Sequence, residues 1–401
     1  KKLILQIQQQ LKADEAMLEY FMTDSFIYCF TVQKGGADLI RSKIEPDFKD
    51  KIIDYIACIK KHRFNEFQDK SIYLYNNLIK PVRKSILNKT KLIIIPDGQL
   101  LYLPFGSFIS KKQNTANNID FSKLDYLIKD YEIVTQYSAN LWLESIQYTQ
   151  KDNLGNGFLG LAPFSDSTSL FLKIDSTNLS FLDRSLPEDV INSLVNNHEY
   201  KPLPYSGKEV NEIAQLFESQ GINTKNLFGT NATEQKLKNN SKHNKYLHIA
   251  THGIINNIHP ELSGLAFVKD NSEIPNKKVL EDWQIEQNAD GILYAKEIYD
   301  LDLNAELVVL SACESGIGKL EKGEGIMSLT RGFLYNKVPN IVFSLWKIND
   351  KDACTLMIKF YENILKGKSY SLALRNAKLD MINDKETAFP SNWAAFSLIG
   401  N

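Results

Sequence analysis

The chain has 401 residues, of which 43% are hydrophobic and 24% charged, with a formal net charge of −1. This composition is typical of a globular protein of two or three domains and lacks the basic surplus of proteins that bind nucleic acid or anionic membranes. The four cysteines form no CxxC pair and no apolar run reaches the roughly 20 residues of a membrane span, so we expect a soluble, cytoplasmic protein without disulfides.

The first 90 residues predict a helix, two strands and further helices. The chain starts at Lys1, not at a methionine, and residues 1–21 have helical spacing throughout, so we expect one helix that continues from a missing N-terminal region. Aromatic and β-branched residues at 25–34 run into a Gly-Gly pair, which predicts a hairpin. Helical spacing returns at 47–62 and 71–87. A buried strand at 91–95 then meets a Pro-Asp-Gly turn.

A second series of elements begins near residue 155. The polar segment 165–202 predicts a long loop. Ser206, with Glu209 three residues later, has the spacing of a capping box and predicts the start of a helix. Further predicted strands alternate with predicted helices to the end of the chain, the strands lying at 157–164, 225–229, 245–253, 306–313, 340–348 and 393–400. This alternation predicts an α/β fold with a mostly parallel sheet flanked by helices.

Two of these strands end in residues that suit nucleophilic catalysis. The strand KYLHIATHG delivers His252 and Gly253, and the strand LVVLSAC delivers Cys313. Functional groups collect at the carboxyl ends of parallel strands, where an imidazole can hold a neighbouring thiol partly as thiolate. The backbone N–H groups of Gly253 and Cys313 would then form an oxyanion hole.

Simpler interpretations of the same residues remain open. A single cysteine at a strand end is often only a small buried side chain, as we expect of Cys29, Cys58 and Cys354. His248 and His252 share a strand face at i, i+4 spacing, but no third ligand follows at a zinc-site spacing, so we expect no metal and no cofactor.

Several segments resemble the CHAT protease domain, a bacterial relative of caspases and separase. They include HIATHG, LVVLSACESGIGKLEKGEGIMSLTRGFLYNKVPNIVFSLWKIND and NWAAFSLIG, and the likeness extends upstream through LIIIPDGQLLYLPFGSF. The resemblance implies a caspase-hemoglobinase fold with a dyad of His252 and Cys313. It also implies a non-catalytic, pseudo-caspase-like half at 1–150, a catalytic half at 151–401, and an upstream tetratricopeptide-repeat or sensor region. Proteins of this family often act in bacterial defence by cleaving a partner protein.

The substrate pocket is less clearly indicated. Ser311 stands two residues before the nucleophile, where metacaspase-like relatives have Asp, so that family's specificity rule does not transfer. Asp350 and Asp352 suit a pocket for Arg or Lys, although acidic residues are also favoured at a helix N-terminus. Trp346 suits a pocket wall or the core, and Glu314 suits a contact with His252 or the substrate.

The sequence thus predicts a regulated cysteine endopeptidase. We expect low activity until a trigger orders the segments at 165–202 and 316–325. The alternative is a catalytically silent caspase-like scaffold that acts as a protein-interaction module. We expect a protein substrate, with no direct binding to nucleic acid or membrane.

Overall fold

The computed structural model describes most of the chain, namely residues 2–113, 119–148, 155–165, 170–172, 198–256, 262–269, 291–314 and 324–400. The chain divides into two compact units. The first unit combines residues 1–152, 319–323 and 339–401, and the second combines 153–318 and 324–338. The C-terminal 63 residues, 339–401, therefore cluster with the N-terminal region.

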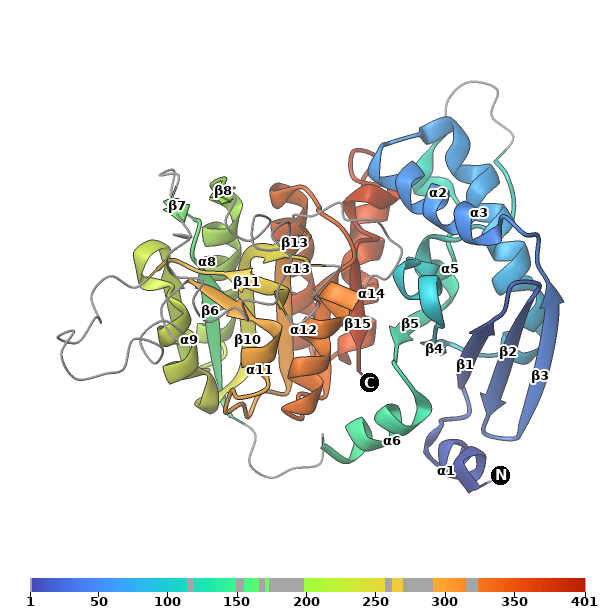
Figure 1. The fold of residues 1–401 in the computed structure, drawn as a ribbon, viewed down its shortest axis with the longest axis horizontal. Coiled ribbons are helices and arrows are strands. Elements are labelled where there is room, and N and C mark those ends of the chain that lie inside the picture. Colours follow the sequence, from blue (N-terminus) through green and yellow to red (C-terminus); the bar gives the residue numbers. More distant parts are fainter. Residues whose placement is uncertain are drawn as a thin grey trace, which may run out of the picture. The chain divides into compact units, whose positions relative to one another are not determined.

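The first unit contains a mixed sheet with a parallel centre (Figure 1). Its strand order is β14 (Asn340–Ser344), β15 (Phe396–Ile399), β5 (Glu132–Thr135), β4 (Lys91–Ile95), β1 (Glu15–Met22), β2 (Phe26–Gln33) and β3 (Gly36–Lys43). The pairs β15–β5, β5–β4 and β4–β1 are parallel, while the other neighbours are antiparallel. The apolar run of β4 is buried from Leu92 to Ile95, as expected for a strand with a neighbour on each side.

Helices of the first unit lie between and beside these strands in the chain. They are α1 (Lys2–Gln10), α2 (Phe48–Lys60), α3 (Phe64–Leu78), α4 (Arg83–Ile86), α5 (Leu127–Asp130), α6 (Ala139–Tyr148), α13 (Asp350–Leu365) and α14 (Tyr370–Asn383). The helix α14 packs on α13 and on the strands β5 and β15. None of the helices in the described ranges is both long and apolar enough to cross a membrane.

One predicted helix is wrong beyond residue 10. The segment Glu15–Met22 is the strand β1, so the N-terminal region has three strands where the sequence predicted two. Glu, Ala, Met and Leu are good helix formers, but tertiary contacts routinely override helix propensity. Here β1 pairs with both β2 and β4 and buries Ala16, Met17 and Leu18, which a surface helix would not achieve.

The second unit is built on four parallel strands (Figure 1). Their order is β9 (Thr224–Phe228), β6 (Gly157–Ala162), β10 (Asn244–Ile254) and β13 (Leu307–Glu314). The short strands β11 (Gly264–Ala266) and β12 (Ile292–Tyr294) continue antiparallel from the end of β10. The helices are α8 (Pro204–Glu218), α9 (Glu234–Asn240), α11 (Ala295–Ile298) and α12 (Glu324–Tyr335). The predicted α/β architecture, a largely parallel sheet flanked by helices, is confirmed.

The start of α8 differs from the sequence prediction. The helix begins at Pro204 after the N-cap residue Leu203, so Ser206 lies inside the first turn and donates its hydroxyl to the Leu203 carbonyl at 2.7 Å. Proline suits the first helical position because its ring presets the backbone angle and its missing N–H is not needed there. The predicted capping box is therefore wrong, and the Glu209 side chain has another partner.

Part of the predicted polar loop at 165–202 is also ordered as strand. Leu170–Leu172 (β7) and His198–Tyr200 (β8) pair antiparallel in a small separate sheet. Residues 173–197 lie outside the described part of the chain. The strand β8 leads directly into the segment that contacts His252.

Candidate active site

The strands β10 and β13 bring the two predicted catalytic residues to neighbouring positions. They pair in parallel register, in which His252 is opposite Cys313 and Gly253 is opposite Glu314. Adjacent strands lie about 4.8 Å apart, so the backbones of His252 and Cys313 are immediate neighbours although 61 residues separate them. The side chains of Cys313 and Glu314 lie outside the part of the chain that the structure describes.

A backbone carbonyl fixes the tautomer of His252. The ring Nε2 lies 2.7 Å from the carbonyl oxygen of Lys201. Because a carbonyl only accepts, Nε2 must carry the proton of this hydrogen bond. In the neutral imidazole the proton-accepting nitrogen is then Nδ1, so the ring is set up to act as a base through Nδ1.

Two aromatic rings pack against the His252 imidazole and restrict its orientation. The Phe164 ring meets it edge-on with a centroid distance of 5.0 Å, and the Tyr200 ring lies tilted at 5.3 Å. His252 is only 5% exposed. Phe164 and Tyr200 also pack with Leu203, which donates its backbone N–H to the Phe164 carbonyl at 2.7 Å. This apolar cluster therefore limits both the rotation of His252 and its contact with water.

His248, four residues before His252 on β10, forms a buried ionisable pair with a side chain of α8. The Nε2 atom of His248 is 2.7 Å from Oε1 of Glu209, which α8 provides. His248 is 0% exposed and Glu209 is 1% exposed. The segment of Lys201 to Glu209 is thus fastened to β10 at two points, through the Lys201 carbonyl and through the Glu209 carboxyl group.

The other cysteines in the described ranges are poor nucleophiles. Cys29, Cys58 and Cys354 are all buried, as expected from their apolar surroundings in the sequence. Burial raises the pKa of Cys29 to about 12 and that of Cys58 to about 11. Their thiolate fractions near neutral pH are therefore very small.

The predicted pocket residues fall in different units. Ser311 is partly exposed on β13 in the second unit, opposite Ala250 of β10. Trp346, Asp350 and Asp352 belong to the first unit, where the Trp346 side chain is 1% exposed. The pocket therefore stays a prediction.

Two of the predicted pocket residues, Asp350 and Asp352, lie in the first turn of α13, where acidic side chains stabilise the helix. Asp350 and Asp352 are partly buried there, after the N-cap Asn349, whose side chain accepts from the N–H of Lys351 at 2.9 Å. Acidic side chains stabilise this end of a helix. Burial raises the pKa of Asp352.

Two contributors to the site have no clear signal in the sequence. The Lys201 carbonyl is a backbone group, and any residue type supplies one. Glu209 was assigned to a capping box, although its place one helical turn inside an amphipathic helix, with His248 on a buried strand, is the pattern of an interior pair. Pairing Glu209 of α8 with His248 of β10 requires the three-dimensional packing, which no local pattern specifies.

The architecture around this site is the caspase-like fold. The separase chain of the Saccharomyces cerevisiae separase–securin complex superposes on all of this chain and on 30% of its own length, with a TM-score of 0.50 and 10% identity. Residues 68–401 match the family model of the CHAT domain, and the chain belongs to this family.

Curated relatives place the domain in much longer proteins. The chain is 24% identical over 359 residues to tetratricopeptide repeat protein 28 of Homo sapiens and 22% identical over 360 residues to that of Mus musculus. Each match covers 82% of this chain but only 13% of the relative.

Proposed function

We propose that this chain is a cysteine endopeptidase whose catalytic dyad is Cys313 and His252. The observation that carries the proposal is the register of β10 and β13, which sets the two residues side by side at the carboxyl ends of parallel strands. The hydrogen bond from Nε2 of His252 to the Lys201 carbonyl supports it, because a general base needs a fixed tautomer and orientation.

The proposed reaction follows from these positions. Nδ1 of His252 takes the thiol proton of Cys313, and the thiolate attacks the carbonyl carbon of the scissile peptide bond. The backbone N–H groups of Gly253 and Cys313 donate to the oxyanion. The imidazolium then protonates the leaving amine, and water attacks the resulting thioester to release the acid and restore the thiol.

The residue preference and biological setting are further parts of the proposal. A preference for Arg or Lys before the cleaved bond is proposed from the sequence alone, on the acidic residues Asp350 and Asp352. The region 1–150 would serve as the non-catalytic half and 151–401 as the catalytic half. The tetratricopeptide repeats in the names of the curated relatives support an upstream repeat region in the whole protein. A protein partner as substrate, in bacterial defence, is proposed from the resemblance to the CHAT protease domain alone.

A catalytically silent scaffold is the second candidate. The 5% exposure of His252 beneath Phe164 and Tyr200 favours it, because a general base must reach the substrate's leaving group. A peptidase of this geometry requires a movement of that cover before it can act.

Mapping of new protein termini separates the two candidates. We expect the full-length protein, triggered in cells, to generate new termini in a partner protein, and we expect Cys313→Ala to abolish them. Cys354→Ala, a change at a buried cysteine of α13, serves as the matched control and should leave the termini intact. Termini that persist in the Cys313→Ala strain, or their absence in the triggered wild type with the signalling response retained, would contradict the peptidase proposal.

A further inference from the structure

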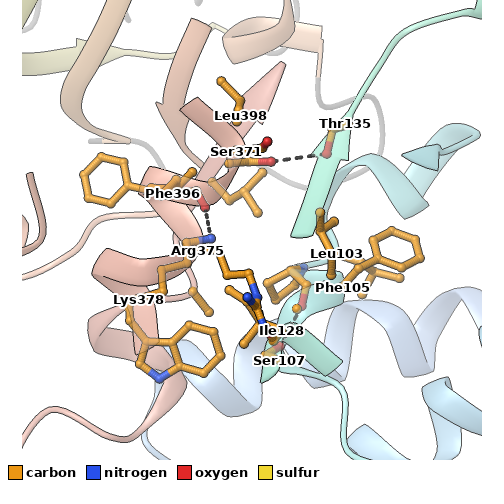
Figure 2. A pocket seen from close by; sticks show the side chains of 18 residues that line it. Leu103, Phe105, Ser107, Ile128, Thr135, Ser371, Arg375, Lys378, Phe396 and Leu398 are labelled. Carbon is orange, nitrogen blue, oxygen red and sulfur yellow. Dashed lines mark hydrogen bonds between the residues drawn. The ribbon is translucent and has the colours of Figure 1, made fainter. Parts of the chain in front are cut away.

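A small cavity lies within the first unit, away from the strands β10 and β13. Its volume is about 40 Å³, and its walls come from the segments around Leu103–Ser107 and Ile128–Thr135, from α14, and from β15 with the residues before it. Figure 2 shows Arg375 and Lys378 of α14 on one side and Leu103 and Phe105 on the other. The cavity wall therefore combines apolar side chains with a nearly equal share of polar surface, including two cationic side chains.

Among the residues that the structure describes, these two cations donate hydrogen bonds to backbone carbonyls. Arg375 donates from Nε to the Ile128 carbonyl at 2.8 Å and from its terminal nitrogen to the Lys129 carbonyl. Lys378 donates from Nζ to the Phe396 carbonyl at 2.5 Å. Within the described ranges, neither forms an ion pair with a carboxylate, whereas most other partly buried cations of the chain do.

None of the described residues that line the cavity is an aspartate or a glutamate that could pair with Lys378. Ser371, one helical turn or more before the two cations, donates to the carboxylate of Glu132 at 2.7 Å, so that acid has a partner of its own. Arg375 adds a second positive charge three residues before Lys378 on the same helix. A cation in this setting loses its hydration without gaining a counter-charge.

Burial changes the protonation of the Lys378 amine. It lowers the pKa of Lys378 to about 7, and loss of hydration is the only cause that contributes. Near neutral pH the amine is thus divided between its charged and neutral forms. An anion in the cavity would favour the charged form, since an opposite charge within a few ångströms raises the pKa of an ammonium group.

We propose that this cavity binds a small carboxylate anion of about the size of acetate, whose oxygens accept hydrogen bonds from the Lys378 ammonium. The single carbonyl partner leaves two of the three ammonium hydrogens for the ligand. The apolar side chains of Leu103, Phe105 and Trp393 suit the hydrocarbon end of such an anion. A volume of about 40 Å³ suits an anion of this size better than a nucleotide.

Binding must depend on pH in a defined direction. The charged amine is the form that binds, and its population falls above the pKa of the empty cavity. The apparent affinity for acetate should therefore fall by about tenfold per pH unit above about pH 7, until the raised pKa of the complex is reached.

Thermal unfolding of the whole chain tests the proposal with sodium acetate as the probe and sodium chloride at equal ionic strength as the reference. At pH 6.5 we expect saturating acetate to raise the unfolding temperature by about 2 to 4 °C. Lys378→Met, which keeps the length of the side chain without its charge, should remove the shift. Lys359→Met on α13, where the lysine is paired with Asp380 at the surface, is the matched control and should keep it.

A second measurement uses the wild-type protein, so its result does not depend on whether Lys378→Met folds. Reductive methylation followed by peptide mass spectrometry reports the reactivity of Lys378, and acetate should slow its modification severalfold without affecting Lys359. No acetate-specific shift, a shift that survives Lys378→Met, or unchanged methylation of Lys378 would each overturn the proposal. A larger effect of phosphate than of acetate would overturn its assignment to carboxylates.

Discussion

Replacement of His252 by alanine is expected to lower the rate of partner cleavage by a factor of about 10² to 10⁴, the usual contribution of a general acid–base group. The imidazole is proposed to activate the thiol and to protonate the leaving amine, so its loss affects both halves of acyl-enzyme formation. The effect should fall on kcat more than on KM, because the ring contributes to the transition state and little to binding of the substrate. The measurement is the rate at which new termini appear in the partner protein.

His243→Ala is the matched control for this change. His243 is exposed and lies just before β10, so its loss should leave the cleavage rate within about twofold of the wild type. A His252→Ala protein that keeps more than a tenth of the wild-type rate would show that this imidazole is not the catalytic base.

The largest expected effect on stability belongs to Glu209→Ala. The change removes the carboxyl group that lies 2.7 Å from Nε2 of His248, in a site that water does not reach. Loss of one partner of a buried polar pair typically costs about 2 to 5 kcal/mol. We expect the free energy of unfolding in urea to fall by about that amount, with an unchanged m-value.

Two other substitutions on α8 serve as comparisons for Glu209→Ala. Glu209→Gln keeps the side-chain length and a hydrogen-bonding group, so it should cost clearly less than Glu209→Ala. Glu212→Ala removes an acid that is 41% exposed and paired only at the surface with Lys208, and should change stability by less than about 0.5 kcal/mol. Equal losses for Glu209→Ala and Glu212→Ala would contradict the structural role of the buried pair.

The fold was largely predictable because its signals are local. Apolar runs such as LIII at 92–95 and LVVL at 307–310 read as buried strands, and the helices between them show clear amphipathic spacing. The prediction failed at Glu15–Met22, where residues of good helix propensity form a central strand. Pairing with β4, more than 70 residues away, decides that segment, and no local pattern records it.

The candidate site was predictable to a different extent. His252 and Cys313 could be singled out because each follows an apolar strand and the rules for parallel sheets bring strand ends together. The Lys201 carbonyl could not, because backbone groups are the same at every residue. Cavities such as that beside Lys378 also arise from packing between distant segments, which a sequence pattern does not specify.

The reactivity of the Cys313 thiol tests the central claim most directly. With pKa values of about 12 and 11, Cys29 and Cys58 should react slowly with iodoacetamide below pH 8, and peptide mass spectrometry separates each cysteine from Cys313. We predict that Cys313 in the triggered protein is alkylated rapidly at pH 6 to 7 and that His252→Ala slows this reaction at least tenfold. An alkylation rate of Cys313 that is the same with and without the His252 imidazole across this pH range would contradict the proposed dyad.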